Sequence, residues 1–268
     1  PNGFGFSNQT VIGWEGNYFT PLAWLSGSYW ARGVPARYES EGRTLCGGMY
    51  TFGAYTYGLA AGEAPAPGSV KWTMADGYLP ALTTSFTRNG VAIAITNFAD
   101  RQTIAGGSFE LVHTRVRVTN NTGQAVPVPP GASGPGLVDQ TERPATVQPG
   151  ETVDHDYVAA VDDFGSGQAL PSPAQLKAEA AGFTAALNRM KDYWNDRLTV
   201  APTLSLPNVA LPDTGGLTNP GTALSNAFKA AFVYTRIIQA GKAPFSGANT
   251  YSGNTTITQG TLKVGVAG

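Results

Sequence analysis

The sequence predicts a mainly β protein, an antiparallel β-sandwich (super-sandwich) followed by two helices and a short C-terminal β-solenoid-like hairpin. Apolar runs at 79–87 and 91–98 flank Asn89-Gly90, a pair that tolerates the positive φ angles of a tight hairpin turn. Apolar and polar residues alternate over 109–119, which is typical of a strand covered on one face. The chain holds 34 Gly and 19 Pro with only 13% charged residues, which favours short strands joined by turns.

Around this central hairpin the sequence predicts further β structure. The Gly- and Tyr-rich stretch 45–62 predicts one or two strands in which glycine allows bends. The proline-rich stretch 125–149 predicts edge strands and loops, because proline cannot donate to a central ladder. Residues 152–161 alternate again and predict a longer strand.

The hydrophobic period changes after residue 165. Ser172, Pro173 and Gln175 predict a helix start with a capping box and proline at the first helical position. Apolar residues then recur at spacings of three and four as far as Leu198, which predicts a single helix of about seven turns.

A second helix is expected over 222–242, with Gly241 as its terminating residue. Its expected inward face consists of Leu224, Ala227, Phe228, Ala231, Tyr234, Thr235 and Ile238. The expected units are a β-sandwich domain over 1–165, a linker helix within 166–199, an extended linker over 200–221, the helix over 222–242 and a β segment over 243–268.

Composition excludes several function classes. The net charge is -1 and no basic patch exists, so we expect no nucleic acid partner. The apolar runs fall short of the roughly 20 residues of a membrane helix, so we expect no membrane insertion within this chain. Residue 1 is Pro, and any export signal is expected to be removed or to lie outside this sequence.

No cofactor and no metal are expected. The single cysteine, Cys46, excludes an internal disulfide framework and is expected to be a small buried residue. Asp154, His155 and Asp156 are residue types that bind metals, but the two aspartates share a strand face that His155 opposes. A solvated face is therefore the expectation there.

Aromatic residues are the candidate ligand-binding residues. The rings of Trp24, Trp30, Trp72 and Tyr78 could stack on sugar faces, with oligo- or polysaccharide as the partner. The alternative for the aromatic residues of the first 35 positions is that they pack over a sheet edge. Catalytic residues are unknown from the sequence, and the weak candidates are Glu15, beside Trp14, and Asp76.

Several ordered segments carry a family resemblance. They are 72–80 (W-T-M-A-D-G-Y-L-P), 95–100 (I-T-N-F-A-D), 115–120 (R-V-R-V-T-N), 147–153 (V-Q-P-G-E-T-V), 161–164 (V-D-D-F) and 192–198 (D-Y-W-N-D-R-L). In this order they resemble the N-terminal β-sandwich of bacterial glycoside hydrolases and phosphorylases that join it to an (α/α)6 barrel, the glucoamylase-like and maltose-phosphorylase-like group. The resemblance covers roughly residues 40–242 and implies that 223–241 is the first barrel helix, with the family's catalytic carboxylates on later barrel loops absent from this chain.

The C-terminal residues carry a second resemblance. Residues 246–265 read S-G-A-N-T-Y-S-G-N-T-T-I-T-Q-G-T-L-K-V-G and closely resemble the passenger-associated repeat of bacterial autotransporters. This resemblance implies one rung of a β-solenoid, which cannot bury its own apolar face. The rung is expected to dock on a neighbour, self-associate or begin a longer array, in a secreted, cell-surface or periplasmic bacterial protein.

Three functions follow from these patterns. The first is a carbohydrate-active protein whose sandwich orients or shields sugar while the catalytic barrel is absent or truncated. The second is a non-catalytic secreted or surface passenger that is adhesin-like. The third is a self-sufficient glycosidase that uses sandwich carboxylates, which requires two carboxyl groups flanking the bond.

Overall fold

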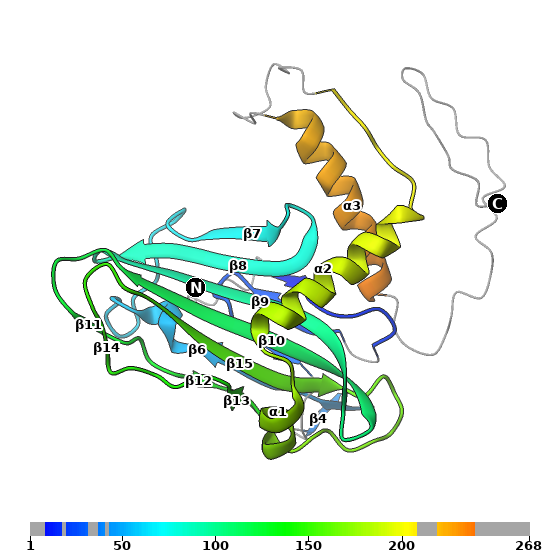
Figure 1. Ribbon diagram of the computed structural model, residues 1–268, viewed down its shortest axis with the longest axis horizontal. Helices are drawn as coiled ribbons and strands as arrows, with labels where there is room; N and C mark the ends of the chain where they lie inside the picture. The colour runs from blue at the N-terminus through cyan, green and yellow to red at the C-terminus, as the bar shows by residue number, and fades with distance from the viewer. Residues whose placement is uncertain (1–8, 18–19, 32–36, 41–42, 208–218, 239–268) are drawn as a thin grey trace.

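Two antiparallel sheets face each other in the computed structural model, which describes residues 9–17, 20–31, 37–40, 43–207 and 219–238 (Figure 1). The five-stranded sheet has the order β1 (Gln9–Val11), β2 (Leu22–Trp24), β3 (Tyr29–Ala31), β6 (Gly48–Phe52), β12 (Ala132–Ser133). The six-stranded sheet has the order β13 (Val138–Asp139), β15 (Thr152–Asp162), β10 (Gly107–Asn120), β9 (Val91–Ile104), β8 (Leu79–Arg88), β7 (Lys71–Ala75). The described part of the chain confirms the predicted β-sandwich with helices.

Short elements complete the sandwich. Two-stranded ribbons pair β11 (Val126–Pro127) with β14 (Thr146–Val147) and β4 (Arg37–Ser40) with β5 (Arg43–Cys46). These strands and β12 and β13 confirm that 125–149 consists of edge strands and loops. In the stretch 45–62, β6 is followed by a 3-10 helix over Gly53–Thr56, so the later tyrosines lie outside the strand.

The predicted hairpin forms the centre of the larger sheet. Arg88 pairs with Val91 across a turn in which Asn89 has φ 50° and Gly90 has φ 77°. Both angles are in the left-handed region, as a two-residue turn of this type requires. The next reversal uses Ala105 (φ 48°) and Gly106 (φ 80°) and joins β9 to β10 over fourteen residue pairs.

The main core lies between the two sheets. The inward side chains of β10 include Val112, Val116 and Val118, which confirms the alternation of that strand. The stacked rings of Tyr29 and Tyr50 face them from the smaller sheet, with ring centroids 4.5 Å apart. Buried apolar area is the dominant stabilising term for such a layer, so this interface holds the sandwich together.

Helices cover the outer face of the six-stranded sheet. A second core forms where α2 (Phe183–Thr199) and α3 (Pro220–Ile238) meet β8 and β9, and its fully buried members include Trp194 and Met190. Figure 1 shows both helices over this face. His113 occupies a polar position of β10 and is nevertheless fully buried, because α2 lies over it, whereas Arg117 farther along the strand stays half exposed.

The expectation of a single helix over 172–198 is wrong. The chain forms α1 (Pro173–Glu179) and α2, separated at 180–182, although the predicted capping box of Ser172 and Gln175 is present. Ala180 leaves the helical region, with φ -66° and ψ 135°, and the side-chain oxygen of Gln102 accepts a hydrogen bond from the backbone N–H of Ala181. The break lets α1 contact β13 and β15 while α2 turns across β9 and β10.

The expected inward face of the last helix is wrong except at Tyr234, which packs against the core under the helices. The side chains of α3 that enter the core are Ala230, Val233 and Ile237, whereas Leu224, Phe228 and Ile238 are exposed. The helix is apolar on two sides, and periodicity by itself cannot say which side meets the sheet. The expected C-terminal β segment and the Cys46 side chain lie outside the residues described, and the domain boundaries stay predictions.

Candidate functional site

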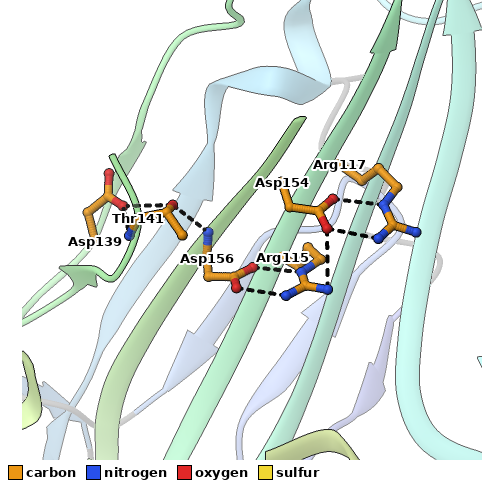
Figure 2. A network of polar contacts seen from close by, with 6 residues as sticks. All are labelled: Arg115, Arg117, Asp139, Thr141, Asp154 and Asp156. Carbon is orange, nitrogen blue, oxygen red and sulfur yellow. Dashed lines mark hydrogen bonds and ion pairs between the residues drawn. The ribbon is translucent and has the colours of Figure 1, made fainter. Parts of the chain in front are cut away.

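The most highly charged side-chain arrangement is a ladder across β10 and β15 (Figure 2). Antiparallel register places Arg115 opposite Asp156 and Arg117 opposite Asp154. Each arginine donates two hydrogen bonds of 2.7 and 2.8 Å to its aspartate, and Arg115 Nη1 lies 3.3 Å from Asp154 Oδ2. Alternation puts all four side chains on the outer face of the sheet, beside the area that α2 covers.

The ladder neutralises its own charges. Hydrogen bonds from Arg117, followed by the nearby Arg115 charge, hold the pKa of Asp154 below its usual range. A carboxylate held in this way stays ionised and accepts from arginine, so it suits neither a general acid nor a metal ligand. Among the residues that the structure describes, no group of three or more His, Cys, Asp or Glu side chains is placed to hold a metal ion.

A small polar cleft adjoins the ladder. Thr141 links the two, because its hydroxyl accepts from the backbone N–H of Asp156 at 3.0 Å while its own N–H donates to Asp139 Oδ1 at 3.0 Å (Figure 2). The cleft holds about 180 Å³, and Ser133, Asp139 and Arg143 are among the side chains that line it. It therefore presents a carboxylate, a guanidinium and a hydroxyl together at the edge of both sheets.

His155 lies beneath the loop that carries this cleft. The ring is buried beside Val116 and Val118, and neither ring nitrogen has a hydrogen-bond partner among the described residues. Burial, followed by the charge of Arg143, lowers the pKa of His155. The imidazole is therefore neutral at neutral pH and acts as a packing group.

Glu15 is an ionic anchor. Its carboxylate accepts from Tyr193 and pairs with Arg197 at 2.8 Å and with Arg236 at 2.5 Å. Burial raises the pKa of Glu15, but the hydrogen bonds from Arg236 and Tyr193 outweigh it, and the pKa lies below the usual value. Glu15 thus ties the loop after β1 to α2 and α3, a role that differs from the proton donor considered from the sequence.

Asp76 occupies a different place. It sits at φ 52° in the turn between β7 and β8, and its carboxylate accepts from Lys191 Nζ at 2.9 Å. Its side chain is 43% exposed. The two candidate carboxylates therefore contact different residues of α2, Asp76 at Lys191 and Glu15 at Tyr193 and Arg197, and do not form a catalytic pair.

The candidate sugar-binding aromatics are dispersed over the fold. Trp24 is buried in β2, and Trp30 is partly exposed in β3, with its ring against Gly47, where a Cβ would lie 1.9 Å from the ring. Trp72 packs at the edge of the core between the sheets, whereas Tyr78 packs in the core under the helices. The Tyr78 hydroxyl donates to Asn195 Oδ1 at 2.7 Å. Trp72 and Tyr78 thus belong to different cores, and the four rings are not gathered on one face of the described structure.

Two buried carboxylates were not anticipated. Glu110 and Asp162 pair across β10 and β15 and are 0% and 1% exposed. Glu110 Oε1 accepts from the backbone N–H of Trp14 at 2.8 Å, and Oε2 has no partner among the described residues. Burial, followed by repulsion from Asp162, raises the pKa of Glu110 well above its ordinary value. The sequence signal that could have revealed Glu110 is its position between two apolar residues, Phe109 and Leu111, within a predicted strand.

A buried polar chain runs through the second core. Arg189 donates to Asp100 Oδ2 at 2.5 Å, and Gln102 Nε2 lies 3.0 Å from the same oxygen and 2.9 Å from His113 Nε2. An amide nitrogen only donates, so His113 Nε2 must accept and the ring proton sits on Nδ1. Burial and the Arg189 charge lower the pKa of His113 to about 3. Asp100, Gln102 and His113 are buried, whereas the Arg189 side chain is 47% exposed and ties α2 to Asp100. The chain therefore positions α2 on the sheet.

Comparison with known proteins identifies one segment. Residues 240–264 match the family model described as the passenger-associated-transport-repeat. No curated protein and no solved structure matches the chain, so the resemblance to glycoside hydrolases gains no support from relatives. Within the described residues, no helix has the length and apolar character needed to cross a bilayer. The repeat supports the autotransporter part of the sequence-based interpretation and indicates a secreted or cell-surface bacterial protein.

Proposed function

We propose that this chain is part of a secreted or surface-displayed passenger, with the β-sandwich as folded cargo and residues 240–264 as its transport repeat. The observation that carries the proposal is the family match at 240–264. The chain also contains a single cysteine and so forms no internal disulfide loop in an oxidising periplasm, which suits threading through a membrane pore. No catalytic pair of carboxylates is required for this role.

Surface display tests the proposal directly. The full chain is placed between a signal peptide and an autotransporter translocator, and the fraction accessible to protease on intact cells is measured. The matched control keeps the 25 residues of 240–264 in shuffled order, which preserves length and composition. We expect several-fold more surface protein with the native order; equal surface fractions for the two would contradict the transport role.

The passenger is further proposed to act as a non-catalytic, adhesin-like protein. Its described surface contains ion-paired carboxylates, such as Glu15 and Asp154, which favour structural roles over catalysis. Purified protein should bind cells or extracellular matrix without competition by free sugars. Binding that added oligosaccharide abolishes would instead support the carbohydrate-based function below.

A carbohydrate-binding sandwich is the second candidate, and the polar cleft favours it. A space of about 180 Å³ lined by Asp139 and Arg143 offers an acceptor and a donor for adjacent hydroxyls. Affinity electrophoresis with a panel of polysaccharides should show retardation that Asp139→Asn and Arg143→Gln weaken. Glu142→Gln, on the same exposed loop, is the control. If Trp30→Ala or Trp72→Ala weakens binding while the cleft variants do not, the aromatic residues are the binding site instead.

A further inference from the structure

The outward side of α3 carries an apolar stripe that no described residue covers. We define the stripe as Leu224, Phe228, Ala231 and Ile238, which are exposed and recur at spacings of four, three and seven. Leu224, Phe228 and Ile238 are 50%, 40% and 57% exposed. Residues at these spacings share one side of a helix, so the stripe runs along α3, with the exposed Thr235 between Ala231 and Ile238.

The stripe is also free of charge. The two cations of α3 are engaged on other sides of the helix, with Lys229 Nζ 4.7 Å from the centre of the Tyr78 ring and Arg236 bound to Glu15. Contiguous exposed apolar surface on a soluble domain commonly marks a contact site. A helix that is apolar on two sides normally has a partner on both.

We propose that the stripe of α3 is the docking surface for residues 240–264 of the same chain. This segment starts two residues after α3 ends. A single repeat unit cannot bury its own apolar face and needs a neighbour to cover it. Its apolar residues include Ile257, Leu262 and Val264, which can pack against the apolar stripe. Its only charged residues are Lys242 and Lys263, so most of the segment is as free of charge as the stripe.

Chain length permits the contact and favours it over dimerisation. The stripe spans 15 residues of helix, and the 14 steps between its ends rise by about 21 Å at 1.5 Å per residue. The 25 residues of 240–264 reach up to about 80 Å when extended, so the segment can fold back along all of α3. A directly tethered segment has an effective concentration of order millimolar, which exceeds the micromolar concentration of a second copy.

Hydrogen exchange of the full chain tests the docking. We expect the amides of 255–264 to exchange at least about tenfold more slowly than their unstructured rates, because the docked strands protect them. The double variant Leu224→Asp/Ile238→Asp places charge on the stripe and should abolish this protection. Val200→Asp charges another exposed apolar residue, 82% exposed and outside α3, and should leave it intact.

Three results would overturn the docking. They are unprotected amides at 255–264, protection that the stripe variant leaves unchanged, and protection that disappears on dilution from about 100 to about 2 μM, which would assign the stripe to a second copy. Amides of β9 and β10 report folding in the same experiment. If they lose protection in the double variant, Ile238→Asp alone is measured. The readout uses purified protein, so failure of export leaves this test unaffected.

Discussion

Protonation of His113 is expected to limit the acid stability of the protein. The ring is fully buried, stacked on Phe98 at 5.4 Å, and accepts at Nε2 from Gln102. Burial and the nearby Arg189 charge lower its pKa to about 3, against about 6.5 in an unfolded chain. As pH falls below 6.5, His113 therefore takes up a proton in the unfolded state while its ring stays neutral in the folded state. The free energy of unfolding decreases as a result, down to about pH 3.

The magnitude follows from linkage. Each pH unit in this window removes about 1.4 kcal/mol, so the loss from His113 is about 2 kcal/mol at pH 5 and about 4 kcal/mol at pH 3, where the folded-state ring is half protonated. In His113→Gln the same loss is absent, although the substitution also changes packing at every pH. The slope of unfolding free energy against pH separates the two effects, because a packing change shifts the curve without tilting it.

Urea unfolding between pH 7.5 and 4.5 measures that slope for both proteins. NMR adds a direct reading, because the chain contains two histidines and His155→Gln assigns their resonances. The His113 ring should show no titration above about pH 4. Equal slopes for wild type and His113→Gln, or a titration midpoint near 6.5, would refute the buried neutral imidazole.

Three further predictions concern buried groups. Glu110→Gln should raise the free energy of unfolding at pH 7 and not at pH 4. The pKa of Glu110 is raised in the folded protein, so wild type loses stability as pH rises above the ordinary pKa of a glutamate, and the neutral glutamine does not. Equal urea midpoints for the two proteins at pH 7 would contradict this. Trp194→Ala should cost about 3–5 kcal/mol by thermal unfolding, since this fully buried indole fills the core beneath α2. Gln102→Met should cost about 1–3 kcal/mol and speed hydrogen exchange at Ala181, which loses its acceptor; unchanged exchange there would count against the explanation for the helix break.

Local signals in the sequence were sufficient for the central sheet. Asn89-Gly90 encodes its turn because both residues tolerate positive φ, and the alternation of β10 encodes which side chains meet the core. Proline in 125–149 encodes edge strands. The capping box at Ser172 and Gln175 encodes a helix start through hydrogen bonds within four residues. Each of these features depends on neighbours in the chain.

Long-range contacts decided the rest. The helix over 172–198 breaks where Gln102, about 80 positions earlier, offers an acceptor to Ala181, and no local pattern contains that information. The Arg115 and Asp156 pair arises from strand register. The same holds for the candidate site. The sequence shows Glu15 as a carboxylate beside a tryptophan, but it does not show that Arg236 lies next to Glu15 and holds it ionised.

The sequence by itself determined the elements, the sandwich class and the repeat at 240–264, because turn chemistry, period and short motifs are local properties of a chain. Only the tertiary structure decided which apolar side of α3 meets the sheet and which carboxylates are buried or ion-paired. Burial and pairing depend on segments brought together by packing, and Ala230, Val233 and Ile237 enter the core because β8 and α2 meet that side of α3.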